Sequence, residues 1–417
     1  MKKYSTLFSF ILLFAFLITP IASNAQEDEI TEGRDYWVGI PHCKMLEEEP
    51  IRGDVPIALW ISSKVDTRAT ISAAAIGLEQ TVNIEANKFT VFELGDDLMN
   101  TESEEVKDYG IHVTSEDPIS LIMYLSYKWS GEAFRCIPTE WLGKKYVSCN
   151  MYQDKTDEYK PPQILIIATE NNTVVRYYPT QPTEKVDRGS AGTAVLRKGQ
   201  TFLIHGRINP GLNQDWLTDI TGTYIESTKP IAVVSGHTKG AFPRYNSGMP
   251  DNYQLHWANF LRNMLTEMLW PVELLGTEYI SAPIKYFDRP RNQTSVQDDA
   301  GDLIRIVAAF NDTELYQMRQ DGSGLLRIGY TLDRGEWWNI TNQEDPAYYK
   351  ATKPVLICQY GKTWWSEDVP GRERTNKKDQ PQNPQRNGQG MMLTLAPLDH
   401  WCSYANFKAP TLIDNFI

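Results

Sequence analysis

Two adjacent tryptophan pairs, Trp337-Trp338 and Trp364-Trp365, are the residues of this sequence best suited to bind a ligand. Neighbouring side chains of a β-strand point to opposite faces of a sheet. One member of each pair therefore lies outside its core unless another layer of the protein covers it. An exposed tryptophan ring can stack on a sugar or anchor a protein partner, whereas packing between domains would bury it. Both interpretations stay open, and these four tryptophans are the candidate ligand-binding residues.

Residues able to hold a metal or perform catalysis are scattered. The six histidines match neither H-E-x-x-H nor any His/Cys spacing suited to zinc. His237 ends an apolar run, and we expect its ring to satisfy a backbone group of a turn. Asp298, Asp299 and Asp302 offer the hard oxygens that calcium prefers, but their spacing fits no EF-hand and favours a solvated loop. We expect no metal, no cofactor and no catalytic residue.

The first 25 residues predict a signal peptide. Lys2 and Lys3 precede the apolar run LFSFILLFAFLI, and residues 23–25 form a small-x-small cleavage pattern. No other run approaches the length of a membrane span, so we expect an exported chain without membrane insertion. Its location would be extracellular, at the cell surface or periplasmic. The formal net charge of −12 argues against a nucleic-acid partner, which demands clustered lysine and arginine.

Cysteine usage agrees with export but does not define a scaffold. The chain has five cysteines, which are Cys43, Cys136, Cys149, Cys358 and Cys402. An oxidising compartment permits one or two bridges among them, and the odd count leaves at least one thiol over. Composition does not give the pairing.

Strand patterns dominate the chain and recur. Pro118, Pro230 and Pro354 each open a step into an apolar run, and they are spaced by roughly 110 to 125 residues, a domain-sized period. Around them, four element types recur in one order: a strand–turn–strand segment, a polar turn before an apolar strand, the proline motif, and a proline linker into an aromatic strand. The first of these segments carries a shared threonine (Thr67, Thr173 and Thr313) after Asx residues, and we interpret it as a hairpin.

The sequence therefore predicts a mainly β protein of tandem antiparallel β-sandwich-like repeat units. The expected units span 33–143, 144–276 and 277–399, and residues 400–417 would begin a truncated fourth unit. Only 253–269 shows helical periodicity, so we expect one short helix there. Residues 371–390 lack large apolar side chains and should form a loop.

Several of these stretches resemble the N-terminal domain family of IgG-Fc-binding proteins, found in bacterial secreted proteins. The resemblance covers most of 33–417 and rests on five motifs, which are EGRDYWVGIP, the strand–ENNT–strand segment, LTDITGTYIESTKPIAVVSGH, LLGTEYIS and MMLTLAPLDHWCSYANFKAP. These motifs consist of glycines, turn residues and strand hydrophobes. The resemblance implies protein binding at the cell exterior, but it carries over no residue as an antibody contact.

Three functions from different classes fit the sequence. The leading hypothesis is a secreted or cell-surface, non-enzymatic binding or adhesion protein that recognises a host protein, a glycan or an envelope component. The alternatives are a secreted carbohydrate-active enzyme or its carbohydrate-binding module, and a purely architectural stalk. An enzyme needs a cleft with converging carboxylates, an adhesin needs exposed aromatic residues and long loops, and a stalk needs neither.

Overall fold

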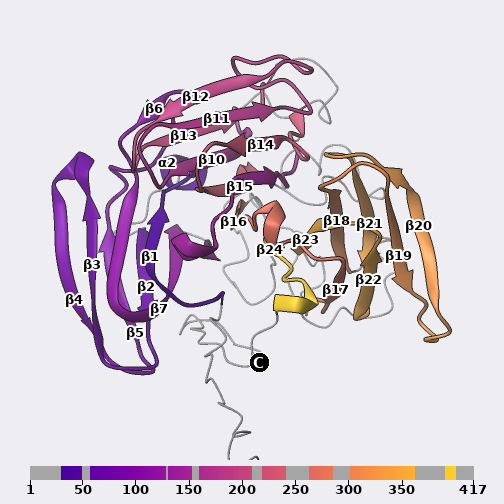
Figure 1. Cartoon of the computed structure of the whole chain (residues 1–417), viewed down its shortest axis with the longest axis horizontal. Coiled ribbons are helices and arrows are strands. Elements are labelled where there is room, and N and C mark those ends of the chain that lie inside the picture. The colour runs from indigo at the N-terminus through magenta and orange to yellow at the C-terminus, as the bar shows by residue number, and fades with distance from the viewer. Residues whose placement is uncertain are drawn as a thin grey trace, which may run out of the picture.

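The computed structural model describes residues 30–48, 57–127, 130–152, 159–208, 218–240, 263–284, 301–361 and 390–400. Within these residues the chain is mainly β and forms five sheets whose strand pairs are antiparallel, which confirms the predicted fold class. Figure 1 shows three groups of strands that follow one another along the chain, coloured indigo to purple, magenta and orange. We call these groups the first, second and third sandwich.

The first sandwich is built around one long strand, β7 (Ile111–Tyr127). The first half of β7 pairs with β1 and β3, whereas its second half pairs with β2 and β8. Pro118 lies between the halves, so β7 passes from one layer into the other there. The remaining strands are β1 (Gly33–Val38), β2 (Ile57–Ser62), β3 (Thr67–Ala73), β4 (Leu78–Ile84), β5 (Phe89–Leu94) and β8 (Ser130–Arg135).

The second and third sandwiches repeat this pairing with separate strands for the two layers. In strand order, the second has layers β12-β11-β14-β9 and β16-β15-β10-β13, and the third has β20-β19-β22-β17 and β24-β23-β18-β21. The second contains β9 (Lys145–Val147), β10 (Pro162–Ala168), β11 (Thr173–Tyr178), β12 (Gly192–Leu196), β13 (Thr201–His205), β14 (Tyr224–Ser227), β15 (Ile231–Gly240) and β16 (Asn263–Met268). The third contains β17 (Glu278–Ser281), β18 (Asp302–Ala308), β19 (Thr313–Met318), β20 (Leu325–Leu332), β21 (Trp337–Gln343), β22 (Ala347–Ala351), β23 (Val355–Gly361) and β24 (Met391–Thr394).

The recurring prolines occupy one place in this pattern. Pro230 and Pro354 directly precede β15 and β23, which are the counterparts of the second half of β7 after Pro118. A proline has no N–H to donate and therefore suits a strand entry between layers. We retain 33–143, 144–276 and 277–399 as proposed unit boundaries.

The predicted strand–turn–strand hairpins are wrong. The strands on either side of each turn, such as β10 and β11, lie in different layers and do not pair with each other. The Asx residues are nevertheless needed, because Asn172 (φ 58°) and Asp312 (φ 54°) adopt the left-handed backbone. The Thr173 hydroxyl donates to the Glu170 carbonyl at 2.8 Å and fixes the turn. These turns therefore connect the two layers of a sandwich.

The helix predicted near 253–269 is wrong over 263–268, where the chain forms strand β16. Met264 and Met268 pack in the core of the first sandwich, whereas Leu265 and Leu269 pack in that of the second. Because both faces of β16 are buried, its apolar residues do not alternate with polar ones, and the run imitates a helix. Residues 253–262 lie outside the described residues.

The described helices are short. They are the α-helix α2 (Lys44–Glu48) and the 3-10 helices η1 (Ala74–Ile76), η2 (Thr139–Trp141), η4 (Val272–Leu274) and η7 (Leu398–His400). None of these helices in the described part of the chain is long and apolar enough to cross a membrane. The predicted signal peptide (1–25), residues 371–389 of the predicted loop and 401–417 of the predicted fourth unit lie outside the described residues.

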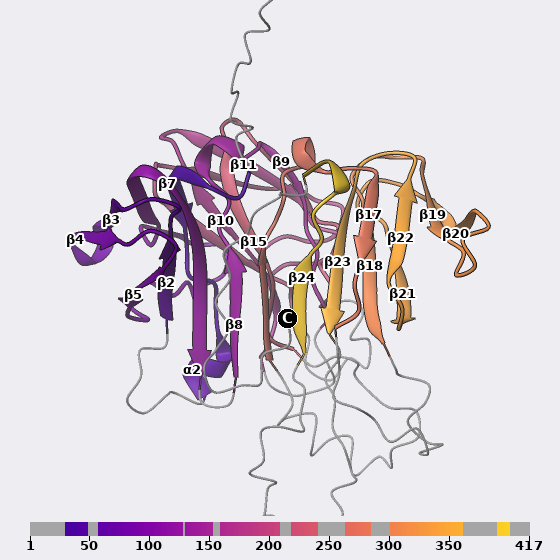
Figure 2. The same cartoon turned by 90° about the horizontal axis from the view of Figure 1, so that it is seen from below.

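Neighbouring sandwiches share buried sheet faces. In β10, Leu165 and Ile167 pack with the core of the first sandwich, whereas Ile164 and Ile166 face the core of the second. In the third sandwich, β18 likewise packs one face against the core of the second sandwich and the other face in its own core. Figure 2 shows β24 close to the second sandwich, where it lies against β16. A strand β6 (Val106–Lys107) from the first sandwich also extends the second by pairing with β13. The three sandwiches are therefore packed against one another rather than strung on open linkers.

Candidate binding cleft between the second and third sandwiches

The structure places Trp337 and Trp338 on opposite faces of β21, as predicted for adjacent strand residues. Trp337 packs against the second sandwich, and the Arg305 guanidinium lies 4.1 Å from its ring centroid. Trp338 packs against the core of the third sandwich, with Tyr330 edge-on at 5.7 Å. Both tryptophans are half-buried. Trp364 and Trp365 lie outside the described residues, and ligand binding by any of the four stays a prediction.

The other singled-out residues have structural partners. The buried His237 ring accepts a hydrogen bond through Nδ1 from the Lys239 backbone N–H at 3.1 Å, as expected for a side chain that satisfies a backbone group. Asp302 is buried in β18, where its carboxylate accepts bonds from the Ile284 N–H at 2.8 Å and the Gln359 amide at 2.6 Å. A solvated loop is therefore wrong for Asp302, while Asp298 and Asp299 lie outside the described residues.

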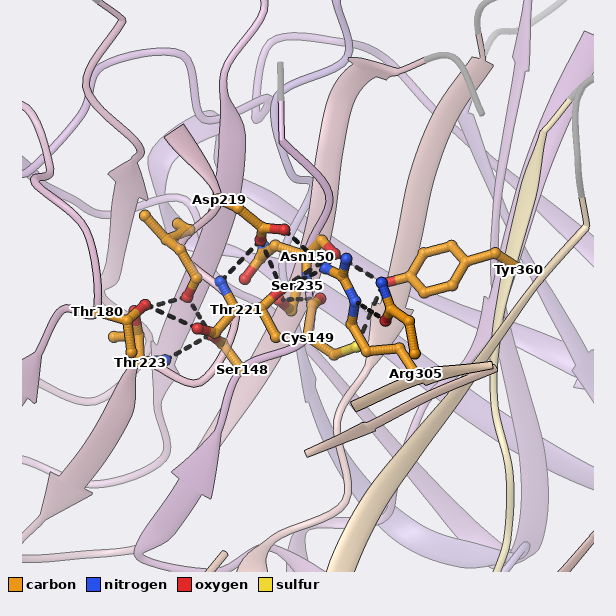
Figure 3. A network of polar contacts seen from close by, with 12 residues as sticks. Ser148, Cys149, Asn150, Thr180, Asp219, Thr221, Thr223, Ser235, Arg305 and Tyr360 are labelled. Carbon is orange, nitrogen blue, oxygen red and sulfur yellow. Dashed lines mark hydrogen bonds and ion pairs between the residues drawn. The ribbon is translucent and has the colours of Figure 1, made fainter. Parts of the chain in front are cut away.

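A buried polar network closes the junction of the second and third sandwiches (Figure 3). From β18, Arg305 Nη1 donates to Asp219 Oδ2 at 2.8 Å, to Thr221 Oγ1 at 2.8 Å and to the Asn150 carbonyl at 2.6 Å. Its Nε donates to Asn339 Oδ1 at 3.0 Å. These partners come from both sandwiches, so the network fixes their relative orientation.

Burial and charge act in opposite directions on Arg305. Burial alone would lower its pKa, but the Asp219 carboxylate, together with the neighbouring Tyr360 and Cys149, outweighs that effect and raises the pKa above the ordinary arginine value. The Arg305 side chain is 1% exposed and that of Asp219 is 4% exposed. Such a pair is inaccessible to a ligand, so the role of this network is structural: it holds the second and third sandwiches together.

A half-open cleft of about 380 Å³ also lies between the second and third sandwiches. We call it the junction cleft. The second sandwich lines it with Lys145, Tyr224, Val272 and Glu273, and the third with Ala309, Phe310, Asn311 and Arg334. Phe310 is 42% exposed, and Lys145, Glu273 and Arg334 are exposed as well. The cleft therefore combines an accessible aromatic ring with charged groups at its rim.

The position of Arg334 follows from two interlocked turns of the third sandwich. The Asn311 side chain accepts a bond from the Arg334 backbone N–H at 3.0 Å, and the Asp333 carboxylate accepts one from the Asp312 N–H at 3.2 Å. The guanidinium then lies 4.1 Å from the centroid of the Tyr224 ring, across the junction. A cation over an aromatic face is a stabilising contact. Arg334 nevertheless stays exposed.

A backbone contact brings the two sandwiches together at this point. Gly222 has φ 81°, and a Cβ placed on it would lie 1.8 Å from the Gly335 carbonyl oxygen. Only glycine permits this approach. The junction between the first and second sandwiches is similar. A Cβ placed on Gly110 would lie 2.3 Å from the Gly199 carbonyl oxygen, and the Lys198 ammonium lies 5.4 Å from the centroid of the Trp37 ring.

The chemistry of the junction cleft suits recognition. Of its eight lining residues, Glu273 alone is a carboxylate, so the described walls supply no acid pair for glycoside cleavage. The pKa of the Tyr224 phenol is raised, chiefly by burial, so the phenol stays protonated. No group of three His, Cys, Asp or Glu side chains in the described part of the chain could hold a metal ion.

Reasoning from the sequence did not identify Tyr224, Phe310 or Arg334. The available signal was the shared register of LRKGQ and LDRGE, which places a cation before a glycine at Lys198 and at Arg334. Two junctions with the same cation–glycine step indicate a repeated contact between sandwiches. The aromatic partners differ at the two junctions, so the repeat pattern did not reveal them.

The fold and the cleft define a mainly β protein of tandem sandwiches with a cleft between two of them. A family model described as IgGFc binding protein matches residues 132–417, and the chain belongs to this family. Of the five motifs that carry the resemblance, EGRDYWVGIP precedes the matched residues. Neither the search of curated proteins nor that of solved structures gave a match.

Proposed function

We propose that this chain is a non-enzymatic, exported protein that binds an extracellular protein through the junction cleft. The family description supports a binding role, and the leader-like residues 1–25 support export. The observation that carries the proposal is the pairing of an exposed Phe310 with Arg334, which lies over Tyr224 in the cleft. Aromatic residues and arginine are enriched at protein interfaces, and tyrosine, tryptophan and arginine are enriched among the few residues that carry most of the binding energy.

The cleft suits a protein ligand because it presents both an apolar anchor point and charges of both signs. Phe310 offers the apolar surface, while Arg334 and Lys145 can bind a carboxylate and Glu273 can bind a cation. A protruding aliphatic or aromatic side chain flanked by an acidic group would satisfy all four residues. A cleft of this size fits one or two such side chains rather than a whole interface.

The identity of the ligand can be tested with probes of two classes. We expect the mature chain to bind a purified extracellular protein in surface plasmon resonance, and the family description makes the IgG Fc fragment the first probe. A glycan array forms the second arm. Binding to glycans without binding to any protein probe would replace the proposed ligand with a sugar. Turnover of a polysaccharide by the chain would contradict the non-enzymatic role.

A further inference from the structure

A hydrogen-bonded chain of side chains crosses the junction between the first and second sandwiches, and we call it the histidine network. Two buried histidines form its centre, His42 between β1 and α2 and His205 at the end of β13, with His42 Nδ1 3.3 Å from His205 Nε2. At one end, His42 Nε2 lies 2.8 Å from Glu47 Oε1. At the other, His205 Nδ1 lies 3.1 Å from the Tyr159 hydroxyl, which donates to Glu184 Oε1 at 2.7 Å.

Backbone contacts hold the two rings together. The His42 N–H donates to Gln163 Oε1 at 2.9 Å, and Gln163 Nε2 donates to the His42 carbonyl at 2.8 Å. His205 is the ladder partner of Gln163, and its own N–H donates to Ser103 Oγ at 2.9 Å. The ring centroids lie 5.2 Å apart. None of these backbone bonds depends on the ring protons, so the number of protons in the network decides whether the rings attract or repel each other.

The hydrogen bonds fix the number of protons. Four bonds need four protons, and an ionised carboxylate only accepts, so neutral His42, His205 and Tyr159 supply one proton too few. Burial raises the pKa of Tyr159, and its single proton goes to Glu184, so its oxygen accepts from His205 Nδ1–H. His205 Nε2 then accepts from His42 Nδ1–H, and His42 Nε2–H donates to Glu47. His42 is therefore the cation, and His205 is neutral.

The charges around the network agree with this count. The hydrogen bond with His42, helped by Lys44, lowers the pKa of Glu47 to about 2, so this carboxylate stays ionised. Burial lowers the pKa of His205 well below its ordinary value, and the charges of His42, Lys44 and His237 act in the same direction, whereas Glu47 opposes them. The surroundings therefore resist a second proton on His205.

We propose that the His42–His205 contact is an acid-sensitive switch, which joins the first and second sandwiches while His205 is neutral and opens when His205 takes up a proton. A proton on His205 Nε2 would set an N–H against the His42 N–H across 3.3 Å and place a second positive ring beside the first. A hydrogen bond then becomes a repulsion. The helix α2, which follows His42 and packs against β15 and β16, should loosen from the second sandwich.

The direction of the pH dependence follows from the neutral state of His205. Below its ordinary pKa of 6.5, the unfolded chain binds a proton that the closed network excludes, so the free energy of unfolding falls as pH falls. Above about pH 6.5 the contribution of His205 is complete. Glu47 contributes only at more acidic pH, between its ordinary value of 4.5 and about 2. His205 therefore sets the acid response of this network between about pH 6.5 and 4.5.

The first test is an NMR titration of the full chain labelled with ¹⁵N-histidine and assigned through backbone connectivities. Ring ¹⁵N shifts distinguish the two neutral tautomers from the cation. At about pH 7.5 we expect His42 to be protonated on both nitrogens and His205 on Nδ1 alone. On titration toward about pH 4, His205 should gain its second proton and the His42 ring signals should shift with it. A neutral His42 or a doubly protonated His205 at about pH 7.5, or an uncoupled titration, would overturn the proposal.

Stability supplies a second readout through His205→Gln, whose amide oxygen can accept from His42 but takes up no proton. As pH falls from about 6.5 to 4.5, we expect the equilibrium constant for unfolding in urea to rise for the unaltered chain, relative to this variant, by up to about tenfold per pH unit. Other titrating groups, such as Glu267, contribute equally to both chains.

His400→Gln is the matched control, since this partly buried histidine of η7 stacks on Trp270 and lies outside the histidine network. It should keep the pH profile of the unaltered chain. Parallel profiles for the unaltered chain and His205→Gln would overturn the proposal. If His205→Gln fails to fold, the NMR titration of the unaltered chain decides.

Discussion

The Tyr146 hydroxyl donates a hydrogen bond of 2.6 Å to the carbonyl of Ile231, the residue that follows Pro230. The same hydroxyl accepts a bond from the Gly143 N–H at 3.0 Å. In the third sandwich, Tyr279 repeats both contacts, with the Val355 carbonyl and the Gly276 N–H. A buried tyrosine thus ties the first strand of each sandwich to the strand that the proline opens, which explains why Gly-x-x-Tyr and the proline motif recur together.

Replacing this tyrosine should destabilise its sandwich. Tyr146→Phe removes the donor from a buried carbonyl and the acceptor from a partly buried N–H, so we expect a loss of about 1–3 kcal/mol in the free energy of unfolding, measured in urea. Tyr178→Phe is the matched control, because that ring is 39% exposed and its hydroxyl reaches Glu226 at the surface. Equal losses for the two variants would contradict the structural role of Tyr146.

The Arg305–Asp219 pair should be far more sensitive than a surface pair. Asp219→Asn leaves a buried guanidinium without its counter-charge, and we expect a loss of about 3–5 kcal/mol in chemical denaturation. The exposed pair Arg197–Asp108, at 3.4 Å, provides the control. Arg197→Ala should cost less than about 1 kcal/mol. A small effect of Asp219→Asn would show that the junction does not depend on this network.

Stability should fall as pH rises, because of a buried carboxyl group in the centre of the molecule. Burial raises the pKa of Glu267 in β16 to about 8. Thr394 of β24 donates a hydrogen bond to the Glu267 carboxyl group at 3.2 Å, and the charge of Arg135 in β8 acts to lower the Glu267 pKa. Glu132 of β8 also interacts with Glu267. Glu132, also buried, has its pKa raised by burial and then by Glu267.

The sign follows from the raised pKa in the folded state. Below about pH 4.5, which is the pKa of Glu267 in the unfolded chain, the carboxyl group is protonated in both the folded and the unfolded state. Its contribution to the free energy of unfolding is then complete. As pH rises toward 8, the unfolded chain releases a proton that the folded chain retains, so the free energy of unfolding falls by at most about 1.4 kcal/mol per pH unit for this group. Urea titrations from pH 5 to 9 should show this decline, and Glu267→Gln should flatten it. A flat profile for the unaltered chain would exclude a raised pKa.

The close approach of Gly222 and Gly335 predicts a contact-specific cost. Gly222→Ala forces a left-handed residue and also drives a Cβ into the Gly335 carbonyl. Gly189 is the matched control, since its φ of 82° is equivalent and a Cβ there would meet nothing within 4 Å. We expect Gly189→Ala to cost about 1–2 kcal/mol through strain alone. Gly222→Ala should cost at least about 1 kcal/mol more in thermal or urea unfolding, and equal costs would show that the junction can yield.

The repeated parts of the fold were predictable, whereas contacts between sandwiches were not. Pro118, Pro230 and Pro354 mark equivalent positions, because Pro230 and Pro354 directly precede β15 and β23, and Pro118 lies where β7 passes from one layer into the other. Periodicity failed at 263–268 because neighbouring sandwiches bury both faces of β16. The turns before Thr173 and Thr313 do not reveal which strands pair, because local sequence fixes a turn but not the sheet that its strands join.

The contacts of the candidate site, like those between the sandwiches, are not predictable from local sequence. The residue type of Trp337 marks it as a candidate, and the structure places its ring against Arg305 of the neighbouring strand β18, on the sheet face that packs against the second sandwich. That packing is not encoded in the local sequence. Tyr224 and Arg334 are about a hundred residues apart in the sequence, so only the packing of two sandwiches reveals that they share a cleft.

Ligand binding by junction-cleft variants tests the central proposal most directly. With IgG Fc or another extracellular protein that binds the chain, surface plasmon resonance should give a Kd at least about tenfold higher for Phe310→Ala and for Arg334→Ala, as expected for interface anchors. Arg319→Ala, an exposed arginine of the turn between β19 and β20, should leave the Kd unchanged. Full-affinity binding by both cleft variants, with melting temperatures like that of the unaltered chain, would contradict the assignment of the binding site to this cleft.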